Sequence, residues 1–216
     1  MILHSLLPHP QDPQQIWVGI SAAGVFYTED GGVNWTPRNR GTRADFLPEG
    51  QNYPEFGQCV HCIVQAAGNP ERLYQQNHCG MYRSDNGGLE WQSIEEGLPS
   101  SFGFPAAADP RDPDTLYLIP LNGDIAGRFM PEGRTAVWRT RDGGESWQAL
   151  REGLPQETCY FNVLRQAMAV DRLTPTGVYF GTSSGSLYAS RDAGDSWTRI
   201  AEHLPPIYSV ETLVVQ

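Results

Sequence analysis

The sequence lacks the long apolar segment that a membrane-spanning helix needs. No apolar run approaches the roughly 18–20 residues that such a helix requires. The opening segment, MILHSLLPHPQDP, also lacks the basic start and the long apolar core of a secretory signal peptide. These absences predict a cytoplasmic protein with no membrane partner.

Positive charge is also in short supply. There is no lysine, and the 15 arginine residues are outnumbered by 25 aspartate and glutamate residues, so the formal net charge is −10. A protein that grips the phosphates of nucleic acid or an anionic membrane needs a basic surface. The charge balance therefore argues against nucleic acid and anionic membranes as the main partners.

Cysteine occurs four times, at positions 59, 62, 79 and 159. These positions do not recur at a constant spacing, so they predict no disulfide framework, and a reducing cytosolic setting fits them. The segment CVHC (59–62) nevertheless raises the question of a metal site, with His78 and Cys79 as further ligands. Side chains alternate along a strand, so Cys59 and His61 point one way and Cys62 the other. Structural zinc sites instead use C-x-x-C in a turn. We therefore expect no metal site, and no glycine loop that would cradle a phosphate cofactor is present.

What the sequence does contain is one octet pattern written four times. The pattern is Ser/Thr-x-Asp/Asn-x-Gly-x-x-Trp, and its tryptophans are 56, 56 and 50 residues apart. The octets (28–35, 84–91, 140–147 and 190–197) share four positions, occupied by Thr28, Asp30, Gly32 and Trp35; Ser84, Asn86, Gly88 and Trp91; Thr140, Asp142, Gly144 and Trp147; and Ser190, Asp192, Gly194 and Trp197.

Each octet lies in a unit that reads as four short strands joined by turns. An apolar segment behind a proline turn and an aromatic segment precede the octet, and a short strand with a stop such as EGLP follows it. Units of about 50 residues with four strands each are typical of propeller blades. The sequence therefore predicts a single all-β domain over 1–216, a β-propeller of four-stranded antiparallel blades at about 1–41, 57–99, 102–155 and 161–206, with a closing strand over 207–215.

The repetition favours a structural role for the octet. Aspartate or asparagine at its third position offers an oxygen to backbone N–H groups of a turn. Glycine at one fixed place supplies backbone freedom, and the tryptophan anchors the last strand by burying a large apolar surface. A catalytic group would be needed once, so four copies on four hairpins indicate a scaffold.

The octets resemble the Asp-box, or BNR, motif of sialidases, xyloglucan-cleaving glycosidases, sortilin-like receptors and a photosystem assembly factor. The segments GQCVH (57–61), LYQQNHCGMYRSDNGG (73–88), LPSSFGF (98–104) and GVYFGTSSGSLYAS (177–190) are similar to a bacterial group of WD40/YVTN/BNR-like repeat proteins, often labelled exo-alpha-sialidase or BNR-repeat glycosyl hydrolase. The resemblance implies a larger propeller of about seven blades, of which this chain holds four. A compact ring of four or five blades and a homo-oligomer are the alternatives.

Two long loops mark the end of the ring where a ligand site is expected. Residues 38–58 connect the first two blades, and residues 120–136 lie inside the third. Long irregular loops on a regular scaffold usually bind or cover something. In a propeller, two kinds of loop lie at this end. One connects the last strand of a blade to the first strand of the next blade, and the other connects the second and third strands within a blade. The octets lie at the opposite end.

Polar and aromatic residues converge at the end with the long loops, and they give the candidate site. The candidate ligand-binding residues are His61, Gln76, Asn77, His78, Arg128 and Phe104. Arginine grips carboxylates in a bidentate fork and aromatic rings stack on sugar faces. This set favours a small anionic or carbohydrate ligand, or a protein partner.

Glycoside hydrolysis needs two positioned carboxyl groups or an activated tyrosine. The candidates are Tyr160, Arg165 and Glu132, but no spacing selects a pair. Sialidases that this repeat resembles also need an early F/Y-R-I-P motif, which does not occur here. We therefore expect a binding scaffold without a catalytic set. The alternative is a sialidase-like glycoside hydrolase acting on terminal sugars, with catalytic residues partly in blades outside this chain, and a third reading is an assembly factor.

Overall fold

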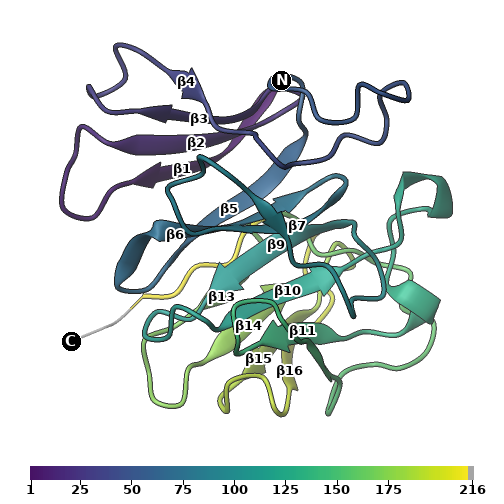
Figure 1. Ribbon diagram of the computed structural model, residues 1–216. Coiled ribbons are helices and arrows are strands. Elements are labelled where there is room, and N and C mark those ends of the chain that lie inside the picture. Colours follow the sequence, from purple (N-terminus) through teal and green to yellow (C-terminus); the bar gives the residue numbers. More distant parts are fainter. Residues whose placement is uncertain (214–216) are drawn as a thin grey trace.

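Four antiparallel sheets of four strands follow one another along the chain in the computed structural model, which describes residues 1–213 (Figure 1). The first blade contains β1 (Ile2–Pro8), β2 (Ile16–Ser21), β3 (Gly24–Thr28) and β4 (Thr36–Pro37). The second contains β5 (Val60–Ala66), β6 (Asn69–Asn77), β7 (Gly80–Ser84) and β8 (Gln92–Ser93). The third contains β9 (Gly103–Ala108), β10 (Leu116–Pro120), β11 (Val137–Thr140) and β12 (Gln148–Leu150). The fourth contains β13 (Met168–Val170), β14 (Val178–Gly181), β15 (Leu187–Ser190) and β16 (Thr198–Ala201). Each sheet uses consecutive strands in order, which confirms the predicted all-β propeller architecture.

The first strands of neighbouring blades pack against one another, so they form the inner side of the arrangement. Contacts join β1 to β5, β5 to β9, and β9 to β13. The long loop of the third blade carries two short 3₁₀ helices, η1 (Asp124–Ala126) and η2 (Pro131–Gly133). No helix within residues 1–213 has the length and apolar character to cross a membrane.

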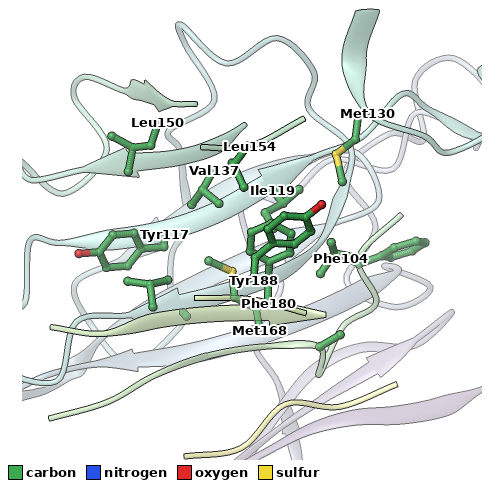
Figure 2. Packing of buried hydrophobic residues seen from close by; sticks show 14 of the residues in the cluster. Phe104, Tyr117, Ile119, Met130, Val137, Leu150, Leu154, Met168, Phe180 and Tyr188 are labelled. Atoms are coloured by element: carbon green, nitrogen blue, oxygen red, sulfur yellow. The ribbon is translucent and has the colours of Figure 1, made fainter. Parts of the chain in front are cut away.

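The hydrophobic core lies between the blades rather than inside any one of them. A lone sheet cannot bury both faces, and each cluster of buried side chains accordingly draws on two neighbouring blades. The largest cluster joins the third and fourth blades. In it Tyr117 and Ile119 of β10 face Phe180 and Tyr188 of the next blade (Figure 2).

The two ends of the arrangement follow from hydrogen bonds between turns. In every blade the octet donates a backbone N–H to the turn between the first two strands, as Gly31 does to Gln14 at 2.9 Å and Ala193 does to Thr176 at 3.0 Å. At the other end, the turn after the second strand meets the linker from the preceding blade, as in the 2.9 Å bond from the His78 N–H to the Cys59 carbonyl. We call these the octet end and the insertion end.

All four octets have the same internal hydrogen bonds. The hydroxyl at the first position accepts the N–H of the glycine at 2.8–3.0 Å and donates to Oδ1 of the third residue at 2.6–2.9 Å. That Oδ1 also accepts the backbone N–H four residues later at 2.9–3.0 Å. Asn86 makes the same bonds as the three aspartates because either side chain carries the acceptor oxygen. All four glycines have φ between +84° and +98°, a region that other residues rarely adopt.

Each octet after the first is also tied to the blade that precedes it. The carbonyl of its fourth residue accepts a bond from the preceding blade, from Trp17 Nε1 at 2.8 Å, Arg83 Nη1 at 2.8 Å and Arg139 Nη1 at 2.6 Å. In return, Trp91 Nε1 donates 2.8 Å to the carbonyl of Arg38, and Trp147 Nε1 donates 2.8 Å to that of Ile94. The bonds are reciprocal between the first and second blades and between the second and third, and we call each such set of inter-blade bonds a latch.

The first octet has no blade before it within the described residues, and its tryptophan differs accordingly. Trp35 Nε1 donates to the carbonyl of Gly32 in its own octet at 3.1 Å, and the side chain is 41% exposed. Trp91 and Trp197 are 3% and 5% exposed. The burial of an octet tryptophan therefore depends on a neighbouring blade.

The octet aspartates predict a loss of stability in acid. Hydrogen bonds from Ser146 and Thr140 lower the pKa of Asp142 to about 2. The pKa of an aspartate in the unfolded chain is about 3.9. The lowered native pKa therefore stabilises the folded state above about pH 4, and this stabilisation disappears as the pH falls from about 4 to about 2. We expect Asp142→Asn, which imitates Asn86, to flatten the pH dependence of the urea midpoint in this window. Asp142→Ala removes the octet hydrogen bonds and should lower the free energy of unfolding at pH 7. The loss should be only about 1 kcal/mol, because the side chain is exposed. Parallel pH curves for the wild type and Asp142→Asn would contradict this assignment.

The C-terminal segment does not form the expected closing strand over the described residues. Within 207–213 there is one bridge, parallel, between Gln166 and Ser209, with the Val210 N–H donating 2.9 Å to the Gln166 carbonyl. The partner strand β13 is only three residues long, and two prolines immediately precede the segment, so no ladder extends from this bridge. Residues 214–215 of the predicted strand lie outside the described residues.

The first and fourth blades meet at a side-chain hydrogen bond. Gln166 Nε2 donates 3.0 Å to the carbonyl of His4. Along β1 the apolar residues Ile2, Leu3 and Leu6 remain 53–63% exposed. The inner strands thus border an open central space instead of a filled core.

Candidate functional site

A cluster of rings occupies the insertion end between the second and third blades. His61 lies on β5, His78 in the turn between β6 and β7, and Phe102 and Phe104 at the start of β9. The ring centroid of His61 is 5.0 Å from that of Phe104, 5.3 Å from that of Phe102 and 5.4 Å from that of His78. The structure therefore brings together three residues that the sequence singled out, namely His61, His78 and Phe104.

His61 is held in one orientation at the centre of this cluster. Its side chain is 1% exposed, and its Nδ1 lies 2.6 Å from the Gly103 carbonyl oxygen. A carbonyl can only accept, so Nδ1 carries the proton and Nε2 keeps its lone pair. That Nε2 lies 3.7 Å from Sγ of Cys59. Burial, reinforced by the charge of Arg165, lowers the pKa of His61 to about 3, so the ring stays neutral at physiological pH.

Two arginines lie over the phenylalanine rings. The Cζ atom of Arg165 is 4.4 Å from the Phe104 centroid, and that of Arg128 is 5.8 Å from the Phe102 centroid. Arg165 is half-buried, which lowers its pKa, and it makes no hydrogen bond or ion pair with any residue in the described part of the chain. Its Nε is buried without a partner. A desolvated guanidinium with no counterion is costly and favours an anionic ligand.

Arg165 also lines the central space. A cavity of about 510 Å³ lies between the inner strands, with side chains from β1, β5, β9 and β13 in its wall. Most of the described residues that line the cavity are apolar. Among them Arg165 is the one arginine and Glu211 is the one acidic residue. A volume of this size is in the range of small-molecule sites.

Two of the predicted ligand-binding residues belong to the scaffold instead. Gln76 is buried, and its Nε2 lies within donor distance of the carbonyls of Asn77, Gly80 and Ser101, at 2.9–3.2 Å. Asn77 is fully buried, and its Nδ2 faces the amide oxygens of Gln58 and Gln75. Their donor groups hold turns together, so neither residue enters the site proposed below.

The three weak catalytic candidates do not form one constellation. Tyr160 is 71% exposed and its ring is 5.1 Å from that of Phe129. Glu132 is exposed and pairs with Arg134 at 4.0 Å. Arg165 contacts neither of them. A tyrosine nucleophile activated by a neighbouring carboxylate, with an arginine on the substrate, is therefore not assembled by these residues.

No carboxyl group among the described side chains has the raised pKa of a general acid. A glycosidase acid requires a raised pKa, so that it stays protonated near neutral pH. Among the carboxyl groups of the described side chains, which leave out that of Asp124, each one whose pKa departs from its usual value is shifted down, namely Asp12, Asp30, Asp142, Asp171 and Asp192. Three of these belong to the octets, at the far end from the ring cluster.

Comparison with known proteins relates the chain to propellers with different activities. No protein-family model matches it. A probable oligoxyloglucan-reducing end-specific xyloglucanase from Neosartorya fischeri is 29% identical over 106 residues, which is 48% of this chain and 12% of that protein. The chain thus spans about an eighth of the length of this relative.

Solved structures show the same fold at low identity. An ancestral GH74 enzyme superposes with a TM-score of 0.68 at 19% identity, over 93% of this chain and 24% of that one. The GH74 xyloglucanase from Xanthomonas campestris gives 0.59 at 20% identity, over 91% and 29%. YCF48 from Cyanidioschyzon merolae gives 0.56 at 20% identity, over 92% and 56%. These similarities support the propeller, and the expected Asp-box and sialidase resemblance remains a prediction.

Proposed function

We propose that this chain is a propeller binding module for a small anionic ligand, such as an acidic sugar, and that Arg165 holds the anion at the insertion end of the central cavity. The observation that carries the proposal is the half-buried Arg165 guanidinium, which lacks a counterion among the described residues and lines a cavity of about 510 Å³. A carboxylate would supply the acceptors that its buried Nε lacks.

The surroundings of Arg165 also suit such a ligand. The Arg165 Cζ atom lies over the buried Phe104 ring at 4.4 Å from its centroid, and this cation–π contact reduces the side-chain freedom that would be lost on binding. The protein as a whole is acidic, with a net charge of −10, so a cationic group in its central cavity is a local exception. Local positive charge in a concave site concentrates anions there.

Titration calorimetry with a panel of carboxylates tests the proposal. The probes are glucuronate, N-acetylneuraminate and succinate, with glucose as the uncharged match for glucuronate. We expect at least one carboxylate to bind, glucose to bind at least tenfold more weakly than glucuronate, and Arg165→Gln to weaken carboxylate binding at least tenfold.

Arg134→Gln is the matched control because Arg134 is 58% exposed, pairs with Glu132 and does not line the cavity. Its affinity should stay within about twofold of the wild type, as is usual for a surface charge. Equal affinities of the wild type and Arg165→Gln for every carboxylate of the panel, or no binding at millimolar concentration, would contradict the proposal.

A glycoside hydrolase is the second candidate, and the GH74 structures and the xyloglucanase relative favour it. Incubation with xyloglucan oligosaccharides and with an aryl sialoside separates it from a binding module. We expect no release of reducing sugar or aglycone. Turnover abolished by Glu132→Gln or Tyr160→Phe would establish the hydrolase instead.

A further inference from the structure

Three side chains of ligating chemistry meet at the insertion end of the second blade. Cys59 stands just before β5, His61 lies on β5, and His78 lies in the turn after β6. The sulfur and ring nitrogens that these residues offer all lie within 4.8 Å of one another. Cys59 is a free thiol and, like His78, is half-buried, whereas His61 is fully buried.

The spacing of two of these atoms matches a tetrahedral zinc centre. With a Zn–S distance of about 2.3 Å and a Zn–N distance of about 2.05 Å, a tetrahedral angle places sulfur and nitrogen about 3.6 Å apart. The Cys59 Sγ to His61 Nε2 distance is 3.7 Å. A zinc ion could therefore contact both atoms without a rearrangement of the strand.

The backbone already holds these ligands in place. The Gly103 carbonyl, at 2.6 Å from His61 Nδ1, fixes the tautomer that leaves Nε2 open, as outer-shell carbonyls do for metal-ligating histidines. The 2.9 Å bond from the His78 N–H to the Cys59 carbonyl joins the turn to the start of β5. Phe46 and Phe102 contact His78 at ring distances of 5.6 and 5.1 Å and restrict that side chain.

We propose that Cys59, His61 and His78 bind one Zn²⁺ ion as a Cys-His₂ set, with a fourth position left for water or an exogenous ligand. One thiolate and two imidazoles suit a borderline-soft ion such as zinc, whereas Mg²⁺ and Ca²⁺ require oxygen ligands. Zinc sites that bind water or substrate usually have three protein ligands and one open position. Purely structural zinc sites usually have four protein ligands.

Positive charge near the site opposes the binding of a zinc ion, so the thiolate of Cys59 is important. Arg165 is close enough to disfavour added positive charge at His61, and Arg128 lies near Arg165. Zinc displaces the thiol proton of a coordinating cysteine, so the thiolate cancels one of the two added charges. Replacing Cys59 with serine removes this compensation and should therefore weaken binding by more than the loss of one ordinary ligand.

Zinc titration with a chelator dye as competitor, together with Co²⁺ as a spectroscopic substitute, tests this proposal on the full chain. We expect one Zn²⁺ per chain and a near-ultraviolet thiolate-to-cobalt charge-transfer band. Cys59→Ser should abolish the band and weaken zinc binding at least tenfold, and His78→Gln should weaken binding at least tenfold while it retains the band. His61 is buried in the core, so its replacement is not needed for the test.

Two neighbouring cysteines serve as controls. The Cys62 thiol points to the carbonyl of Ala106 at 3.7 Å, and Cys79 accepts the N–H of Asp45 at 3.3 Å. Cys62→Ser and Cys79→Ser should keep the wild-type zinc affinity and the cobalt band, with unchanged circular dichroism in all variants. A band that survives Cys59→Ser, a band that follows Cys62 or Cys79, or no zinc uptake by the wild type would overturn the assignment.

Zinc binding by Cys59, His61 and His78 does not require the anionic ligand of Arg165. Arg165→Gln should leave the zinc affinity unchanged or increase it, because a nearby positive charge is removed. Zinc binding and Arg165-dependent carboxylate binding can therefore fail separately in the same set of variants.

Discussion

Replacing Phe180 with alanine should lower the free energy of unfolding by about 3–5 kcal/mol, the range for emptying an aromatic site in a packed core. Phe180 is fully buried, and it stacks on Tyr188 with centroids 5.0 Å apart and meets Trp197 at 5.2 Å. It lies in the cluster that joins the third and fourth blades (Figure 2). The measurement is urea unfolding followed by circular dichroism, which averages over all four blades, and by tryptophan fluorescence.

The matched control for this substitution is Phe56→Ala. Phe56 has the same side chain, but it is 63% exposed in the loop between the first two blades. Its removal should change the free energy of unfolding by no more than about 0.5 kcal/mol. Similar losses for the two variants would show that the interface between the third and fourth blades does not limit stability.

The second large effect is expected at Gly153, which should not tolerate even a methyl group. Its φ is +81°, and a Cβ atom there would lie 2.0 Å from the carbonyl oxygen of Trp197 in the next blade. The neighbouring Glu152 carbonyl accepts the Trp197 N–H at 2.9 Å, so the two backbones cannot separate without breaking a bond. We expect Gly153→Ala to cost about 2–4 kcal/mol, the sum of left-handed strain and overpacking.

Gly97 occupies the equivalent place in the second blade, and its replacement measures the left-handed strain without the overpacking. Its φ is +87°, but nothing lies within 4 Å of a Cβ atom built there. Gly97→Ala should therefore cost only about 1 kcal/mol, from the left-handed backbone alone. Thermal unfolding of both variants measures the difference, and equal losses would mean that the close approach at Trp197 relaxes freely.

The sequence was sufficient to predict the blades because their determinants are local. The octet hydrogen bonds run between residues no more than four apart, and the same four residue types recur in each unit. Spacing alone therefore located the hairpins. The partners of Trp91 and Trp147 were not predictable, because each is a carbonyl some 50 residues earlier in the preceding blade.

The candidate site was predictable only in part, for the same reason. Strand alternation correctly places Cys59 and His61 on one face and Cys62 on the other. The expectation of no metal site rested on the lack of a C-x-x-C turn, although His78 was considered as a further ligand. The structure brings the His78 ring close to Cys59 and His61, and a backbone bond joins its turn to Cys59. Gln76 and Asn77 looked accessible at a turn. Their burial depends on packing against Gln58 and Ser101, which no local pattern encodes.

The latches between blades make stability a nearest-neighbour property. When the free energy is a sum of blade terms and interface terms, a blade that shares two well-packed interfaces loses more of them on unfolding than a blade that shares one. The first blade, with Trp35 exposed and three apolar residues of β1 uncovered, gains least from its neighbours. Amide hydrogen exchange should therefore spread inward from β1–β4, and the ring cluster between the second and third blades would exchange later, when the interface between those two blades opens.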